Sequence, residues 1–151
     1  MEDKEYYEDY KIGEKFISPG RTITEADIVN FAAHTGDWHP LHTDAEYAKN
    51  TVFKERIAHG LLILAIGNAL GLRLGQHVMV PKSFIAFYGI DGLRFTNPVK
   101  IGDTIRLEWE VEDMTPKDNN RGILTYGYQV KNQRDEVVAV YTTKYLVGRR
   151  T

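Results

Sequence analysis

The stretch from His59 to Gly75, HGLLILAIGNALGLRLG, is the only long apolar run in the chain. Its apolar residues are spread around every side of a helical wheel, and a helix of this kind is normally buried. The run contains Asn68 and Arg73 and is too short to cross the roughly 30 Å of hydrocarbon in a bilayer. We therefore expect a central helix at about 59–75 that the rest of the chain surrounds.

The second half of the chain supplies β-structure to surround this helix. Four runs are rich in strand-forming residues, and two of them, 104–111 and 122–130, alternate between apolar and polar positions. Gly89 and Gly92 interrupt the earliest run. The four runs are 84–95, 104–111, 122–130 and 137–147, with turn-forming residues between them at 97–98, 102–103, 117–120 and 132–135. The fold class expected is α+β, with an antiparallel sheet packed on the central helix.

Length and composition narrow the class of protein further. A chain of 151 residues is a natural size for one domain, so we expect a single domain over residues 1–151. The absence of cysteine excludes a disulfide framework and a thiol nucleophile, and the net charge of -2 argues against nucleic acid as a partner. The acidic, aromatic N-terminus does not resemble a secretory signal. We expect a cytoplasmic protein that does not insert into a membrane.

Two short helices are expected before the central one. Thr24 can cap a helix over about 24–34, with Asp27 at the reciprocal position of a capping box and Gly36 ending it. A second short helix is expected over about 44–49, because Asp44 suits a helix N-terminus. The first helix would direct the turn-rich segment that follows it.

Asp37 and His42 lie in this turn-rich segment, and irregular backbone is where catalytic side chains are usually displayed. An acid and an imidazole held close together can bind one water molecule and exchange protons with it. Taken singly, Asp37 also fits a turn or cap residue, and His42 fits a loop histidine bonded to backbone. Which of the two would act as base and which as acid stays open.

The residues around this pair carry a family resemblance. They read, in order, Gly36-Asp37-Trp38-His39-Pro40-Leu41-His42-Thr43-Asp44, then Ala48, Phe53 and Ala58-His59-Gly60-Leu61-Leu62. This pattern resembles the signature of the MaoC-like dehydratase family, the (R)-specific enoyl-CoA hydratases of the hot-dog fold. His39 departs from it, since Asn is usual in that place. The later segment Phe95-x-x-Pro98-Val99-x-x-Gly102-Asp103 is also similar to a family motif.

The resemblance implies a lyase that reversibly hydrates 2-enoyl-CoA to (R)-3-hydroxyacyl-CoA. Asp37 and His42 match the family's catalytic pair, and Gly60 matches the glycine whose N–H binds the thioester carbonyl. His39 is expected to shape the loop or to contact the thioester, and Asn68 to line the pocket. CoA would be part of the substrate, so no separate cofactor is expected.

Several alternatives remain open from the sequence. A thioesterase on the same fold is one, and a non-catalytic acyl-CoA-binding or regulatory subunit is another. His34, His39, His42 and His59 invite a metal hypothesis, but no helical His-x-x-x-His pair supports it and the family implies no metal. His59 is instead expected to be structural, tied to backbone or to the Asp37 loop.

The resemblance and the β-rich edges also suggest self-association. Hot-dog relatives are dimers or larger assemblies with the active site near the subunit boundary, and exposed sheet edges favour pairing with another chain. We expect at least a homodimer. The acyl chain length, the physiological direction and the choice between CoA and acyl carrier protein are not determined by these residues.

Overall fold

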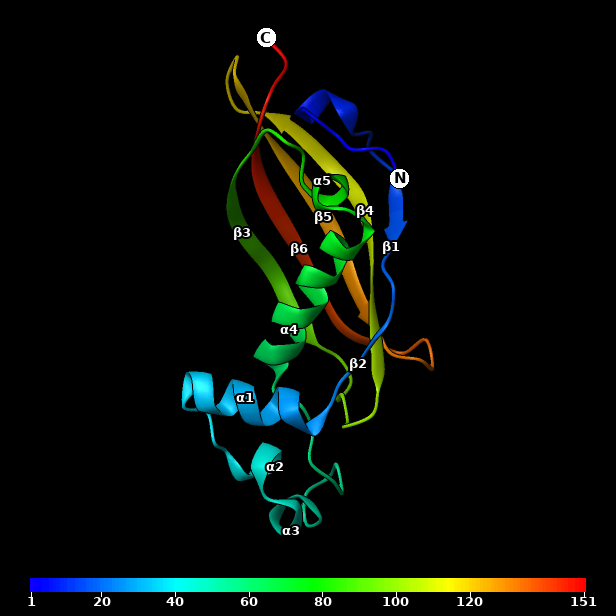
Figure 1. Ribbon diagram of the computed structural model, residues 1–151, viewed down its shortest axis with the longest axis vertical. Helices are drawn as coiled ribbons and strands as arrows, with labels where there is room; N and C mark the ends of the chain where they lie inside the picture. The colour runs from blue at the N-terminus through cyan, green and yellow to red at the C-terminus, as the bar shows by residue number, and fades with distance from the viewer.

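One antiparallel sheet forms the body of the protein, in a computed structural model that describes residues 1–151. The strand order is β1-β4-β5-β6-β3, and β2 pairs with β4 beside β1. The strands are β1 (Lys15–Ile17), β2 (Arg21–Thr22), β3 (Phe84–Phe95), β4 (Thr104–Pro116), β5 (Arg121–Lys131) and β6 (Val137–Gly148). The four long strands coincide with the four expected runs. The prediction of a hot-dog arrangement, a sheet around a central helix, is confirmed (Figure 1).

Alternation along the strands determines which face of the sheet is buried. Ile105, Leu107, Trp109 and Val111 of β4 are all buried, whereas the residues between them are half-buried. Trp109 lies opposite Tyr128 of β5, which in turn lies opposite Tyr141 of β6. This row of aromatic side chains forms the middle of the core, on the face of the sheet that packs on the helix.

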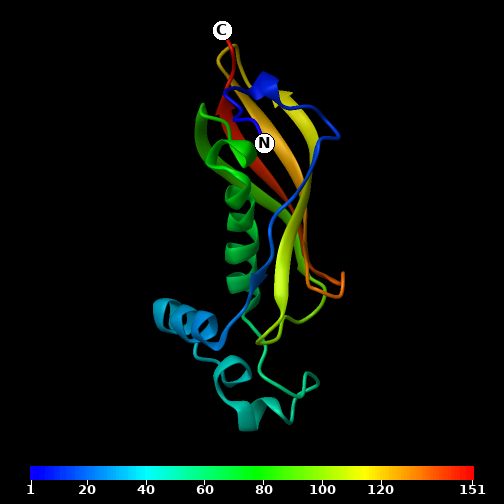
Figure 2. The same ribbon diagram turned by 45° about the vertical axis from the view of Figure 1, so that its right-hand side comes forward.

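The expected central helix begins at Gly60 but has a composite end. It consists of α4 (Gly60–Ala69), the 3-10 turn η2 (Leu70–Leu74) and α5 (Gln76–Met79). Close packing on the sheet depends on Gly67, where a Cβ would lie only 2.7 Å from Val130 Cγ2. In Figures 1 and 2 this helix lies against one face of the sheet and leaves the other face uncovered.

The helix is less buried than its composition predicts. Leu61 is 62% exposed and Leu72 is 46% exposed, and Ala65 and Ala69 between them are also exposed. These residues follow one another at helical spacing, so they form a single apolar stripe. One chain covers only the sheet side of its helix, which leaves this stripe without a partner.

The N-terminal half adds a group of short helices beyond the end of the sheet (Figure 1). They are α1 (Glu25–Thr35), α2 (Pro40–Thr43) and α3 (Ala45–Ala48), and the 3-10 turn η1 (Tyr7–Asp9) precedes them in the chain. The capping box of Thr24 and Asp27 is present, and Gly36 ends α1 with φ of 81°. The helix expected over 44–49 is shorter than expected. The sequence predicts irregular loop where α2 forms, and Pro40 at the first turn explains how this helix begins.

Strand β3 forms an open edge of the sheet. It pairs with β6 on one side only, with shifts of register near its two glycines. Its exposed apolar side chains are Phe84, Ile85, Phe87, Tyr88, Ile90 and Phe95. None of the helices is both long enough and apolar enough to cross a bilayer.

Candidate active site

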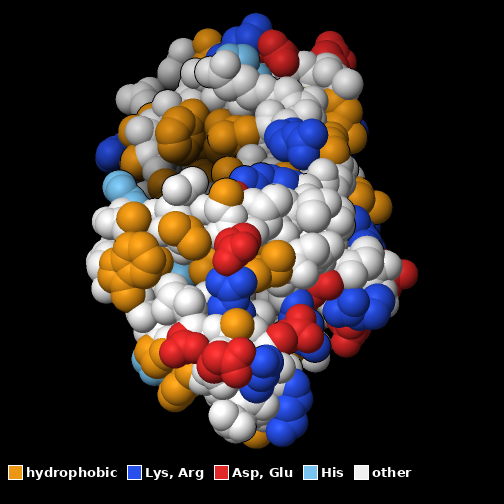
Figure 3. Space-filling view, turned by 60° about the horizontal axis from the view of Figure 1, so that its bottom comes forward, with side chains coloured by type: hydrophobic (Ala, Val, Ile, Leu, Met, Phe, Trp, Pro, Cys, Tyr) orange, Lys and Arg blue, Asp and Glu red, His pale blue; other side chains and the backbone are white.

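A cavity of about 270 Å³ opens where α4 begins. Its walls include His42, Gly60, Phe53, Phe95, Asn97 and Val138. These residues come from α2, from the start of α4 and the segment before it, from the end of β3 and the connection that follows it, and from β6. Figure 3 views the molecule from this end and shows hydrophobic side chains gathered around a hollow, with charged side chains beyond them.

His42 is held in one orientation by the backbone. Its Nδ1 lies 2.7 Å from the carbonyl oxygen of Ile57. Because a carbonyl can only accept, Nδ1 carries the proton and Nε2 keeps its lone pair. Burial lowers the pKa of His42, although the hydrogen bond to Ile57 opposes this effect. The side chain is therefore a neutral imidazole with a free acceptor nitrogen at neutral pH.

Asp37 lies beside His42, directly after the left-handed residue that ends α1. Its Oδ1 accepts a hydrogen bond of 3.2 Å from the backbone N–H of His39. Ligand atoms of Asp37, His42 and His59 lie within 4.8 Å of one another. The carboxylate is exposed, so water reaches it. The acid and the histidine singled out in the sequence are thus brought together.

His59 connects both members of this pair. Its Nε2–H donates to the carbonyl oxygen of Asp37 at 2.9 Å, in agreement with the structural role predicted for His59. Its ring lies against that of His42, with centroids 3.9 Å apart and planes at 30°. His59 is buried, and its Nδ1 has no hydrogen-bond partner. Phe31 of α1 packs on the same ring, with centroids 4.8 Å apart.

Gly60 is the first residue of α4 and lies in the cavity wall. The N–H groups of a first helical turn have no acceptor within the helix, and the positive end of the helix dipole lies there. A Cβ at this position would be only 2.7 Å from the ring of Phe95. A side chain at this position would therefore require the Phe95 ring to move, and the Gly60 N–H has no side chain of its own residue beside it.

His39 caps the helix that carries His42. Its Nδ1 accepts the backbone N–H of Leu41 at 3.1 Å, in the first turn of α2. Asn is among the best N-capping residues because its side-chain oxygen does the same. This gives a physical reason why a histidine can stand where Asn is usual in the resembling family. The His39 ring is exposed and lies 6.1 Å from the His42 ring between centroids.

Asn68 lies two turns further along α4, away from the cavity around His42. Its Oδ1 accepts a long hydrogen bond of 3.5 Å from Tyr145, which also contacts Tyr128 through its hydroxyl at 3.0 Å. Its assignment to the pocket wall stays a prediction.

A larger hollow of about 500 Å³ lies on the sheet face turned away from α4, lined by residues such as Lys15, Glu110 and Lys131. This larger hollow contains no histidine, whereas His42 lines the smaller cavity.

The geometry of the histidines bears on the metal hypothesis. A cation shared by His42 and His59 needs the lone pairs of both rings to converge on one point. The two rings lie against each other with planes tilted by 30°, and each already has one nitrogen directed at a backbone carbonyl. This donor set suits proton transfer better than metal binding.

Two features of the site were not assigned a role from the sequence. One is the carbonyl of Ile57, which determines the tautomer of His42. The other is the segment 96–99, which lines the cavity. The only sequence signal for it was the motif from Phe95 to Asp103. A main-chain carbonyl carries no residue-type signal at all, so no motif could have indicated Ile57.

Comparison with known proteins identifies the family of the chain. A family model described as MaoC like domain matches residues 9–133, and the chain belongs to that family. The (R)-specific enoyl-CoA hydratase of Rhodospirillum rubrum is 39% identical over 112 residues, which cover 74% of this chain and 73% of the relative. The predicted family is therefore confirmed, and its named relatives include a lyase.

Two further likenesses are informative. Protein MaoC of Klebsiella aerogenes is 38% identical over 114 residues, covering 76% of this chain, which spans about a third (32%) of that relative. The X-ray structure of a protein named monoamine oxidase regulatory protein, from Archaeoglobus fulgius, superposes with a TM-score of 0.91 at 40% identity. That match covers 99% of this chain and 98% of the other.

Proposed function

We propose that this protein is a hydro-lyase that reversibly adds water to a 2-enoyl-CoA to give an (R)-3-hydroxyacyl-CoA. The observation that carries the proposal is the pairing of Asp37 with a neutral His42 whose Nε2 is free, next to the N–H of Gly60. The hydratase name of the Rhodospirillum rubrum relative supports the same reaction.

The proposed mechanism uses one water molecule. The Asp37 carboxylate and the His42 Nε2 each accept one of its hydrogens, so its oxygen faces the β-carbon of the substrate. As the C–O bond forms, the pair takes one proton from the water, and the alkene electrons move toward the thioester oxygen. The pair then returns one proton to the α-carbon on the same face, which completes the addition.

Gly60 is proposed to stabilise the charge that develops on the thioester oxygen. Its N–H stands at the positive end of α4 and would donate to this oxygen as it becomes an enolate. Donors of this kind are each worth roughly 3 to 4 kcal/mol of transition-state stabilisation. The reaction involves no redox change, and CoA belongs to the substrate, so we propose that no separate cofactor takes part.

We also propose that the protein acts as a homodimer. Helix α4 carries an exposed apolar stripe, and β3 is an open edge of the sheet that α4 lies against; large exposed apolar surfaces usually mark an interface. A twofold axis would pair β3 antiparallel with its own copy. The beginning of the partner's β3 would then lie beside Phe95, at the open side of the cavity.

The decisive experiment measures loss of the enoyl-thioester absorbance with crotonyl-CoA and, separately, release of free thiol. We expect absorbance loss without thiol release, abolished in Asp37→Asn and His42→Ala. His34→Ala is the matched control, because His34 is an exposed histidine of α1 outside the cavity. It should keep the wild-type rate.

Other outcomes would replace the proposal. Thiol release in place of hydration would identify a thioesterase. Binding of enoyl-CoA without turnover, in a folded protein, would favour a binding or regulatory subunit. The name monoamine oxidase regulatory protein suggests a role of that kind for the Archaeoglobus fulgius protein.

A further inference from the structure

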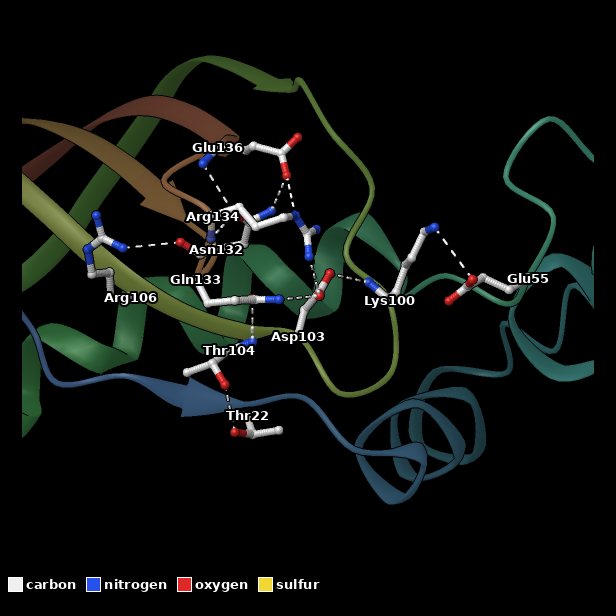
Figure 4. Close-up of polar contacts among 10 residues, drawn as sticks. All are labelled: Thr22, Glu55, Lys100, Asp103, Thr104, Arg106, Asn132, Gln133, Arg134 and Glu136. Carbon is white, nitrogen blue, oxygen red and sulfur yellow. Dashed lines mark hydrogen bonds and ion pairs between the residues drawn. The ribbon is translucent and has the colours of Figure 1, made fainter.

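Asp103 is a buried acid that the proposed mechanism does not use. It is 5% exposed and stands at the start of β4, at the end of the motif that begins with Phe95. Gln133 Nε2 donates to its Oδ1 at 2.8 Å, and Arg134 donates to the same oxygen at 3.3 Å. Figure 4 shows these two side chains reaching across from the turn between β5 and β6.

The other carboxylate oxygen of Asp103 stabilises the connection between β3 and β4, in which Asp103 itself lies. Oδ2 accepts the backbone N–H of Lys100 at 2.9 Å, and the Asp103 N–H donates back to the Lys100 carbonyl at 3.0 Å. Between them Gly102 has φ of 93°, a conformation that favours glycine. Burial alone would raise the pKa of Asp103, but the hydrogen bonds from Gln133, Lys100 and Arg134 outweigh it and lower that pKa.

The segment held by Asp103 in turn holds the residues that orient His42. Lys100 forms a β-bridge with Ile57, and the N–H of Ala58 donates to the Val99 carbonyl at 2.8 Å. The Lys100 ammonium also lies 3.4 Å from the Glu55 carboxylate, as Figure 4 shows. The segment 55–58 is therefore fixed at several points to the connection that Asp103 closes.

We propose that Asp103 is a positioning residue for catalysis, which fixes the Ile57 carbonyl and thereby the tautomer and orientation of His42. The inference rests on the proposed function and deepens it. It connects a buried acid with the catalytic imidazole through Lys100 and Ile57, with a hydrogen bond or β-bridge at each step. An acid that only stabilised its own turn would leave the His42 tautomer unchanged.

The test compares Asp103→Asn with Asp135→Asn. Asp135 is an exposed acid on the same β5–β6 turn, and it bonds Arg106 rather than the segment 96–103. Its φ of 61° is one that Asn tolerates well, so the control variant introduces no backbone strain. Crotonyl-CoA kinetics are combined with nitrogen-15 NMR of the histidine side chains, with the His42 signal assigned by its loss in His42→Ala.

For Asp103→Asn we expect kcat to fall by about 10- to 100-fold with KM within about threefold, because small displacements of catalytic groups reduce the rate steeply. NMR should show His42 losing its single Nδ1–H tautomer. Asp135→Asn should keep both the rate and the tautomer. A wild-type tautomer and a kcat within about twofold in Asp103→Asn, or equal losses in both variants, would overturn the proposal.

Two arrangements keep the test decisive. If Asp103→Asn does not fold, Gln133→Ala removes one of the donors to Asp103 and should shift the tautomer and kcat in the same direction. The NMR measurement needs no substrate, so it tests the inference even if the wild type fails to hydrate crotonyl-CoA. If other short and medium enoyl-CoAs fail as well, the proposed function would be wrong, while the structural connection to His42 is judged separately.

Discussion

The imidazole rings of His42 and His59 lie against each other, with centroids 3.9 Å apart and planes tilted by 30°, and each ring donates one N–H to a backbone carbonyl. His42 donates to Ile57 and His59 donates to Asp37. The buried side chain of His59 therefore contacts both members of the proposed catalytic pair, Asp37 and His42. Gly60 follows His59 directly, so the same residue also places the start of α4.

Replacing His59 tests this connection. His59→Leu should lower the free energy of unfolding by about 1 to 3 kcal/mol, because a buried hydrogen bond is lost. It should lower kcat on the order of 10-fold, because Asp37 loses its anchor. His59→Gln retains a donor and should recover part of both quantities. Urea unfolding and crotonyl-CoA kinetics measure them, and equal kcat in wild type and His59→Leu would contradict the prediction.

The lowered pKa of His42 predicts how activity depends on pH. Hydration needs a neutral Nε2, so kcat/KM should stay high until the pH falls below the ordinary histidine pKa of about 6.5. The folded state binds the His42 proton less readily than the unfolded state does. The contribution of neutral His42 to stability is therefore complete above the ordinary histidine pKa. It is lost as the pH falls through the pKa of His42 in the folded state.

Rate profiles and urea unfolding between about pH 5 and 8 check both statements, with His42→Ala as the variant that lacks the titrating group. The pH dependence of unfolding should be smaller in that variant than in the wild type. An acidic limb at or above the ordinary histidine pKa would show that burial does not control His42.

Gly60 and Gly67 offer a matched pair within one helix. In Gly67→Ala the new methyl would meet buried Val130 at 2.7 Å, so unfolding should become easier by about 1 to 3 kcal/mol. In Gly60→Ala it would meet the ring of Phe95, which is 47% exposed and can move aside. Stability should then change by less than about 1 kcal/mol.

For activity we expect the opposite order, with the larger loss in Gly60→Ala and the smaller one in Gly67→Ala. Gly60→Ala should lower kcat/KM on the order of 100-fold, because the methyl group blocks the approach of the thioester oxygen. Gly67→Ala should retain activity at temperatures where it is folded. Crotonyl-CoA kinetics beside thermal unfolding separate the two, and full activity in Gly60→Ala would remove the proposed role of its N–H.

The exposed apolar stripe predicts how self-association can be broken. Leu61→Lys combined with Ile85→Lys places charges on α4 and on β3, and burying such charges unpaired is costly. The variant should be a monomer with little activity. Val52→Lys, at a residue 86% exposed on the segment after α3, is the control and should keep the wild-type mass. Analytical ultracentrifugation measures the mass of the assembly in solution. An unchanged mass in the double variant would place the interface elsewhere.

The sequence by itself determined the strands, the capped first helix and the position of the turn-rich segment that carries Asp37 and His42. Period-two alternation from Thr104 to Val111 depends only on which side chains face water, and the capping box of Thr24 depends on residues three apart. Such local patterns do not need the rest of the fold. The family resemblance likewise depended on the spacing of Asp37, His42 and Gly60 along the chain.

Only the tertiary structure decided how these residues work together. The tautomer of His42 depends on the carbonyl of Ile57, and that carbonyl is held through Lys100 by Asp103, which follows it by 46 positions. The exposure of Leu61 likewise follows from how far one sheet reaches around its helix. Main-chain groups are the same in every residue, so their positions appear only when distant segments pack.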